Sequence, residues 1–297
     1  MKKSKSFIIC ALLSVILVFL VIGETAVRCA VSFTNEKWCI EIINEKEISS
    51  KVRKSLEKNF NEKYNSTGIP ADVYMNVLTD EWIDNAVKSY ISNGMNYLIG
   101  KNDSYKYEPD FTLINTSIEK FFNEYAEKNN YVKDLAFENK IAATQKNAAN
   151  IIKNYCDVIK MDKLYSEGVL PQARKFVILI NNPIIEITLI ISLLLIVGII
   201  ILINKKNIEL IFYWIGSTMI VSSAIMIIPT AYIKVTRYFD AFIIKQEQIY
   251  ITFTSIMYKA VNTVFTAAVA FLIIGVMFII INGVLSLKKN ISLKKNK

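Results

Sequence analysis

Hydrophobic residues gather in four long runs along the chain, and mostly polar residues fill the segment between the first two runs. The clearest run is Pro183–Asn204 (PIIEITLIISLLLIVGIIILIN), which contains one charged residue, Glu186. About 20 helical residues cross roughly 30 Å of hydrocarbon at about 1.5 Å per residue. Residues 7–27, 210–233 and 260–287 have the same character. We therefore expect four transmembrane helices, because a helix satisfies its backbone hydrogen bonds within hydrocarbon.

The first run has a second interpretation, as a cleaved signal peptide. Residues 1–6 carry three lysines and resemble the positive leader of such a peptide. However, the apolar stretch from Phe7 to Gly23 has 17 residues, which is longer than the usual signal core, and no small-x-small cleavage site follows. We expect residues 7–27 to remain as an anchor, with cleavage as the alternative.

Lysine placement predicts the orientation of the four spans. Three short flanks contain ten lysines: Lys2, Lys3, Lys5, Lys205, Lys206, Lys288, Lys289, Lys294, Lys295 and Lys297. With four spans these flanks all lie on one side, and short basic flanks are cytoplasmic by the positive-inside rule. We therefore expect residues 1–6 and the basic tail 288–297 in the cytoplasm of a multi-pass plasma-membrane protein. Residues 28–182 and the loop 234–259 are expected outside.

The formal net charge of +9 does not indicate a nucleic-acid surface. Residues 28–182 hold 21 basic and 21 acidic side chains, so that segment is neutral and the excess charge belongs to the flanks. Flanking lysines attract anionic lipid headgroups. We expect the lipid bilayer as a partner and no nucleic acid.

The apolar spacing within residues 28–182 is helical almost throughout, and no convincing strand is present. Gly68 and Pro70 interrupt the helical pattern. Thr79 is predicted to cap a helix that ends near Gly100, and Thr116 is predicted to begin the next helix as part of a TSIE capping box. The predicted fold is an all-α membrane protein with four transmembrane helices. A helical extracytoplasmic domain, residues 28–182, is inserted between helices 1 and 2.

Candidate catalytic side chains are few, because the chain has no histidine to act as a base or metal ligand. The chain has two clusters of carboxylate side chains: Asp80, Glu81 and Asp84 form the first, and Asp103, Glu108 and Asp110 form the second. The first cluster fits the acidic first turn of a helix, and the second lacks the ligand spacing of an EF-hand. We predict no catalytic residue, no metal site and no cofactor.

The chain has four cysteines: Cys10, Cys29, Cys39 and Cys156. The last three fall in the segment predicted to be outside, where disulfides persist. A bond between Cys39 and Cys156 would join the two ends of the outer domain, and buried reduced cysteines are the alternative.

Small residues in the third and fourth spans predict close helix packing, because they let helix backbones approach each other. The predicted face consists of Gly216, Ser217, Ser222, Ser223, Ala267 and Ala268. Packing between these two spans is favoured over packing against a partner. The loop 234–259 mixes aromatic and charged residues and is predicted to be an amphipathic interfacial element.

Four short segments carry a resemblance to a known group of proteins: TNEK at 34–37, STGIP at 66–70, LTDEW at 78–82 and YLIG at 97–100. The pattern resembles an uncharacterised family of bacterial multi-span membrane proteins with a helical extracytoplasmic domain. That resemblance implies an architecture and no functional residues, since the family has no assigned function.

These features predict a non-enzymatic membrane protein whose outer domain binds, senses or scaffolds a component of the cell envelope. One alternative is a membrane subunit of an ABC-type complex that transmits force, partnered by an ATPase. The order of one span, a large outer domain and three further spans is similar to MacB- and FtsX-type subunits. Only about five residues, 205–209, join the second and third spans, which is short for an ATPase to grip. The other alternative is an anchored extracytoplasmic hydrolase.

Overall fold

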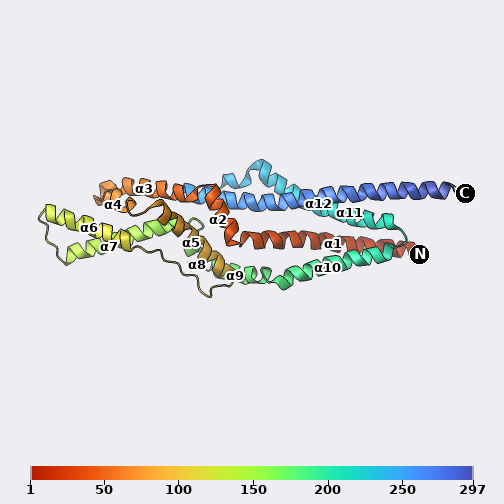
Figure 1. Ribbon diagram of the computed structural model, residues 1–297, viewed down its shortest axis with the longest axis horizontal. Helices are drawn as coiled ribbons and strands as arrows, with labels where there is room; N and C mark the ends of the chain where they lie inside the picture. The colour runs from red at the N-terminus through yellow and green to blue at the C-terminus, as the bar shows by residue number, and fades with distance from the viewer. Residues whose placement is uncertain (1, 296–297) are drawn as a thin grey trace. The chain divides into compact units, whose positions relative to one another are not determined.

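The computed structural model describes residues 2–295. Parts of the predicted cytoplasmic ends lie outside the described residues, namely Met1, Asn296 and Lys297 and the side chains of Lys2, Lys3, Lys294 and Lys295. Every regular element in the described range is helical, which confirms the all-α prediction. In chain order the helices are α1 (Lys2–Phe33), α2 (Glu36–Glu45), α3 (Ile48–Thr67), α4 (Asp72–Met75), α5 (Asp80–Leu98), α6 (Thr112–Lys128), α7 (Leu135–Cys156), α8 (Met161–Ser166), α9 (Val169–Ile180), α10 (Pro183–Asn204), α11 (Ile208–Thr236), the 3₁₀ turn η1 (Tyr238–Ala241) and α12 (Glu247–Lys295) (Figure 1).

Four of these helices are long and apolar enough to cross a membrane. The qualifying segments are Lys5–Phe33, Pro183–Asn204, Ile208–Thr236 and Glu247–Lys289, in α1, α10, α11 and α12. By length and composition, they make this chain a membrane protein, as predicted. Local sequence explains the start of α10, because the Asn182 side chain accepts a hydrogen bond from the Ile184 N–H at 3.0 Å and proline occupies the first turn.

Contacts divide the chain into two units, each of which combines separate segments. Residues 2–33, 177–241 and 257–295 form what we call the membrane unit. The polar unit consists of Thr34–Phe176 together with Phe242–Ile256. The chain therefore contributes two separate segments to the polar unit, and the second of these includes the first turns of α12.

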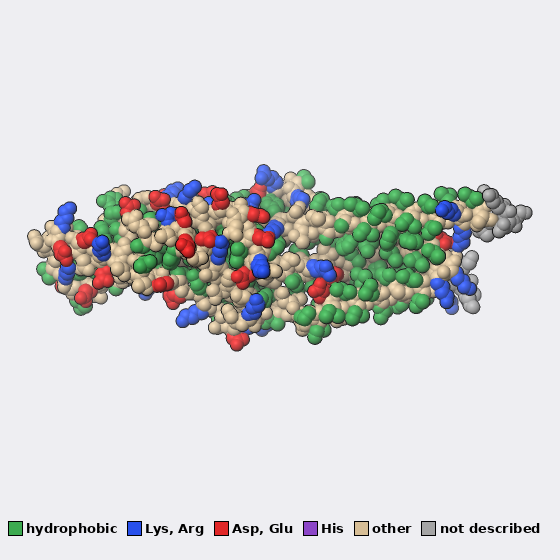
Figure 2. All heavy atoms as spheres, in the orientation of Figure 1, with side chains coloured by type: hydrophobic (Ala, Val, Ile, Leu, Met, Phe, Trp, Pro, Cys, Tyr) green, Lys and Arg blue, Asp and Glu red, His purple; other side chains and the backbone are tan. Residues whose placement is uncertain are grey.

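Within the membrane unit, α1 packs against both α10 and α11 (Figure 1). Its core contains Cys10, Leu17, Ile196, Ile200 and Trp214. The outward side of α10 keeps apolar residues such as Leu194 and Leu202 exposed. Figure 2 shows hydrophobic side chains covering the visible face of this unit, with basic side chains gathered at the end near the N-terminus. Such a surface suits a hydrocarbon environment.

Within the polar unit, α5 lies at the centre and packs against α2, α3, α7 and α8. Its buried side follows the helical period and includes Ile83, Val87 and Ile91. Thr79 caps this helix as predicted, since its hydroxyl accepts a hydrogen bond from the Trp82 N–H at 3.1 Å. Helix α7 also packs against α3 and α6, and α6 packs against α4.

One predicted helix start is wrong, and two helices extend into the predicted loop 234–259. The predicted loop 234–259 is helical at both ends, because α11 continues to Thr236 and α12 starts at Glu247. Buried Thr252 and Ile256 show that the start of α12 is packed inside the polar unit. The TSIE segment does not start a helix, because α6 begins at Thr112 and the Thr116 hydroxyl donates to the Thr112 carbonyl oxygen at 2.9 Å within it.

Candidate functional site

The three carboxylates of the first cluster do not converge on a common point. Asp80 lies 3.3 Å from the Arg53 guanidinium, and Asp84 lies 2.6 Å from the Lys88 ammonium. Glu81 is exposed on the first turn of α5. This arrangement is a solvated helix start, where acidic side chains interact favourably with the helix dipole.

The three carboxylates of the second cluster also interact with separate partners. Asp103 lies 3.6 Å from Arg174, and Glu108 lies 2.6 Å from Lys153, which lowers the pKa of the Glu108 carboxyl. Asp110 accepts a hydrogen bond at 2.9 Å from a backbone N–H in the first turn of α6. Within the described residues, no three histidine, cysteine, aspartate or glutamate side chains could together hold a metal ion. The hydrolase alternative stays a prediction.

Cys39 and Cys156 carry thiols in this structure, and the disulfide between them stays a prediction. Cys39 lies on α2 and Cys156 ends α7, and both are fully buried. Burial, followed by the neighbouring Asp157 charge, raises the pKa of the Cys156 thiol to about 12. A thiol with this pKa stays protonated near neutral pH, so it is a poor nucleophile.

Small residues bring α11 and α12 into close contact. A Cβ atom added at Gly216 would lie 3.0 Å from the Gly275 carbonyl oxygen, and one added at Gly275 would lie 3.0 Å from the Gly216 carbonyl oxygen. The remaining residues of the predicted face are fully or partly buried, with Ser222, Ser223 and Ala268 fully buried and Ser217 and Ala267 partly buried. Backbone therefore meets backbone at this crossing, as expected for helices that pack through small residues.

Buried tyrosines form an aromatic cluster beside α8. The Tyr105 hydroxyl donates to the Asp162 carboxylate at 2.9 Å, and the rings of Tyr97 and Tyr165 stack edge-on at 5.5 Å. Burial raises the pKa of both the Tyr90 and the Tyr105 phenols. These phenols therefore stay neutral, and the cluster contributes packing rather than a reactive phenolate.

A polar cavity of about 310 Å³ lies in the polar unit, between α3, the end of α7 and the start of α12. We call it the polar pocket, and its lining residues are Ser55, Lys58, Asn59, Glu62, Tyr155, Lys245, Gln246, Glu247 and Gln248. Two lysines and two glutamates make it neutral overall. Its volume lies near the lower end of the range for small-molecule sites, roughly 300–1,000 Å³.

Three side-chain amides lining the polar pocket have an unpartnered polar atom. They are the Asn59 Oδ1, Gln246 Oε1 and Gln248 Nε2 atoms, which are buried and lack a hydrogen-bond partner among the described residues. Gln248 is 0% exposed, and its Oε1 atom accepts a hydrogen bond from the Ser55 hydroxyl at 3.2 Å. Each buried polar atom left unpaired costs about 1–3 kcal/mol. These three unpaired atoms belong to residues that line the same cavity.

No sequence pattern predicts the polar pocket. Asn59 and Gln248 are far apart in the chain, and neither belongs to a recognisable motif. Gln248 belongs to the segment 234–259, whose aromatic and charged residues predict an interfacial amphipathic element, so the complete burial of Gln248 is not expected from sequence. The only local signal is the spacing of Ser55, Asn59 and Glu62, which places them on one side of α3.

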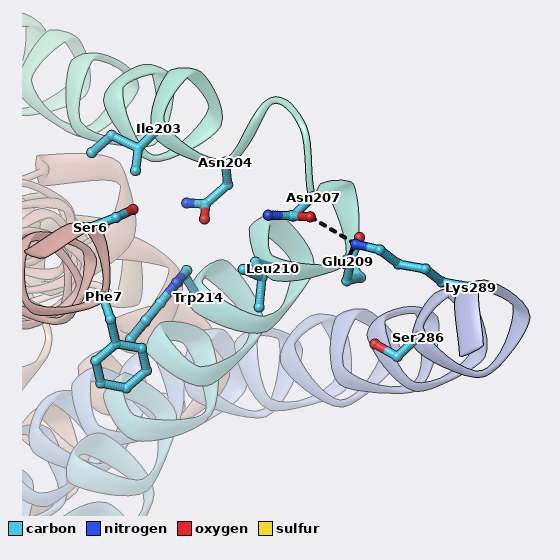
Figure 3. Close-up of a pocket in the computed structure, with 10 residues that line it drawn as sticks. All are labelled: Ser6, Phe7, Ile203, Asn204, Asn207, Glu209, Leu210, Trp214, Ser286 and Lys289. Atoms are coloured by element: carbon cyan, nitrogen blue, oxygen red, sulfur yellow. Dashed lines mark hydrogen bonds and ion pairs between the residues drawn. The ribbon is translucent and has the colours of Figure 1, made fainter. Parts of the chain in front are cut away.

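A second cavity, of about 470 Å³, lies at one end of the membrane unit, and Figure 3 shows its residues. We call it the end pocket. Its polar lining residues are Ser6, Asn204, Asn207, Glu209, Ser286 and Lys289, and its apolar ones are Phe7, Ile203, Leu210 and Trp214. Lys289 reaches from α12 to α11, where its ammonium donates to Asn207 Oδ1 at 2.7 Å and to the Glu209 carboxylate. The cavity thus combines a hydrogen-bonding side with an aromatic and aliphatic one.

Comparisons with known proteins found no match among protein-family models, curated proteins or solved structures. The resemblance to an uncharacterised bacterial family stays a prediction. Functional inference therefore rests on the geometry and chemistry of the chain itself.

Proposed function

We propose that this membrane protein acts by binding a small, uncharged, hydrogen-bonding solute in its polar unit, which lies outside the cytoplasm. The observation that carries the proposal is the set of three unpartnered amide atoms around the polar pocket. Two are acceptors, on Asn59 and Gln246, and one is the Gln248 donor. A complementary ligand offers at least two donors and one acceptor, as adjacent hydroxyl groups do.

Charge and shape narrow the ligand class further. Lys58 and Lys245 are balanced by Glu62 and Glu247, so the pocket does not select a strongly charged molecule. Tyr155 adds an aromatic ring, which can cover a flat apolar face. Amides, hydroxyls and one aromatic ring favour a saccharide-like polyol. The carboxylates are paired with cations or with helix N-termini, and the buried phenols stay neutral. Neither set offers a reactive side chain, which supports binding rather than catalysis.

The location outside the cytoplasm is supported by the lysines that flank the spans. Lys205 and Lys206 follow α10, and Lys288 and Lys289 lie near the end of α12, so both flanks fit the cytoplasmic side. Ser104 in the polar unit and Ser292 near the end of α12 are both exposed. In a Cys29→Ser background, which removes the half-buried native thiol, a membrane-impermeant maleimide should label Ser104→Cys but not Ser292→Cys in intact cells, and should label both after permeabilisation. The reverse pattern would contradict the orientation.

Ligand binding is tested by the thermal stability of the full chain in lipid nanodiscs. A panel of neutral mono- and disaccharides is compared with sugar phosphates and amino acids. A ligand at 100 times its Kd stabilises the folded state by about 2.7 kcal/mol. This corresponds to a rise in Tm of roughly 5–11 °C for a unit of 150–250 residues. The rise should disappear in Asn59→Leu. A panel in which no neutral saccharide raises Tm, or a rise that survives in Asn59→Leu, would contradict the proposal.

A further inference from the structure

The end pocket lies where a lipid headgroup would meet the membrane unit. Its residues come from the first residues of α1, the end of α10, the start of α11 and the last part of α12. These positions are the ends of the four membrane-long segments. The pocket therefore lies at a membrane–water boundary, whichever side of the membrane that boundary faces.

Positive charge is concentrated around this pocket. Lys289 lines it, and Lys5, Lys205, Lys206 and Lys288 are exposed and directly adjoin lining residues in the sequence. Glu209 is the one acidic lining residue. Five lysines against one glutamate leave a local charge of +4 among the described side chains. The polar pocket, in contrast, is balanced.

The start of α11 adds to the attraction for an anion. Asn207 occupies the N-cap position, but its side chain does not cap the helix backbone and instead accepts from Lys289. The positive end of the helix dipole thus faces the pocket. Glu209 in the first turn of α11 holds the Lys289 ammonium in place (Figure 3).

The rest of the lining suits the remainder of a phospholipid. Asn204 is 5% exposed, and its Nδ2 atom donates to the Ile200 carbonyl oxygen at 2.9 Å and to Cys10 Sγ at 3.2 Å. This amide is fixed at the pocket wall, where it can meet a polar headgroup. Phe7 and Trp214, in edge-on contact at 5.0 Å, offer an aromatic surface typical of membrane interfaces.

We propose that the end pocket binds the headgroup of an anionic phospholipid such as phosphatidylglycerol. The phosphodiester binds Lys289 and the start of α11, and the glycerol hydroxyls form hydrogen bonds with the side-chain amides of Asn204 and Asn207. Phe7 and Leu210 contact the beginning of an acyl chain. Binding of the phosphate displaces the Glu209 carboxylate from Lys289. This site is independent of the polar pocket.

Native mass spectrometry of the full-length protein in detergent tests the site, by titration with dioctanoyl phosphatidylglycerol or dioctanoyl phosphatidylcholine. Lys289→Gln should weaken phosphatidylglycerol binding by at least about tenfold, because a charge-assisted hydrogen bond is lost. Lys288→Gln removes the same charge beside the pocket and should weaken binding by about fivefold at most. Glu209→Gln should strengthen binding, since Lys289 is then released from its carboxylate. Lys289→Arg should retain binding, which controls for folding.

Other results overturn the proposal. Equal losses in Lys289→Gln and Lys288→Gln would mean attraction by general surface charge. Equal binding of phosphatidylcholine would mean nonspecific lipid contact. Weaker phosphatidylglycerol binding in Glu209→Gln would point to recognition of a cationic headgroup. Competition by water-soluble glycerol phosphate at the same concentration would assign the site to a free phosphate ester instead of a lipid.

Discussion

Replacing Gln248 by methionine should stabilise the ligand-free protein. Gln248 is 0% exposed, and its Nε2 atom has no hydrogen-bond partner among the described residues. Methionine has nearly the same length and removes the buried donor, which recovers about 1–3 kcal/mol. The Ser55 hydroxyl loses its acceptor at 3.2 Å, which costs about 0.5–1.5 kcal/mol. The net gain is about 1 kcal/mol.

Gln145 provides a matched control of opposite sign. Its Nε2 atom donates to the Asn115 carbonyl oxygen at 3.1 Å, so its amide is already paired. Gln145→Met should therefore lower stability by about 0.5–1.5 kcal/mol. The two substitutions make the same chemical change, at an amide N–H that is paired in Gln145 and unpaired in Gln248. Gln145 is partly exposed and Gln248 is buried, so the sign of the effect is compared rather than its size.

Tryptophan fluorescence during heating measures both variants in the full-length protein. Trp38 and Trp82 lie in the polar unit, and Trp214→Phe removes the signal from the membrane unit. A gain of 1 kcal/mol raises Tm by about 2–4 °C for a unit of 150–250 residues. If Gln248→Met lowers Tm as Gln145→Met does, then the Gln248 amide is satisfied in solution. The polar pocket would then lose the observation on which the proposed function rests.

Three further predictions concern other parts of the chain. Gly275→Ala should destabilise the membrane unit by about 1–3 kcal/mol, because the new Cβ would lie 2.8 Å from Ile220 Cγ1 and 3.0 Å from the Gly216 carbonyl oxygen. Gly283→Ala on the same helix meets nothing within 4 Å and should be neutral or stabilising in the same thermal assay. Burial raises the pKa of the Asp157 carboxyl, so the folded protein favours its protonated form. The contribution of Asp157 to folding stability is therefore present at low pH and is lost as pH rises through the pKa of the folded protein. Asp157→Asn should therefore reduce the fall in Tm between about pH 4 and pH 8. Mass spectrometry after rapid alkylation of the denatured, unreduced protein should find separate thiols at Cys39 and Cys156, and a linked peptide pair would contradict the buried-thiol assignment.

The spans could be predicted from sequence because their signal is local. In hydrocarbon, length and apolarity alone decide whether a segment becomes a helix, and Pro183–Asn204 has the bounds that its composition indicates. Thr79 was predictable for a similar reason, since a capping side chain bonds a backbone N–H three residues away. In both cases the deciding interaction is contained in the segment.

The helix start at Thr116 was mispredicted, and the start of α12 was not predicted, because tertiary packing decides both. Ile114 and Ile118 are both buried on one side of α6, so packing continues this helix through the TSIE segment. At 247–256, charged and aromatic residues suggested an interface, but Thr252 and Ile256 are buried in the polar unit. The polar pocket is less predictable still, because it needs α3 beside the start of α12, nearly 200 residues away in sequence.

The distribution of charge gives a way to separate the two proposed sites in one protein. The net charge of +9 belongs to the span ends, and Lys289 lines the end pocket while Lys5, Lys205, Lys206 and Lys288 adjoin its lining residues in sequence. Exposed charges interact over about 10 Å at 0.1 M salt but only about 3 Å at 1 M. Phosphatidylglycerol binding at the end pocket should therefore weaken steeply as salt is raised. Binding of a neutral solute at the balanced polar pocket should change little over the same range. If both respond equally to salt, the assignment of opposite chemistries to the two cavities is wrong.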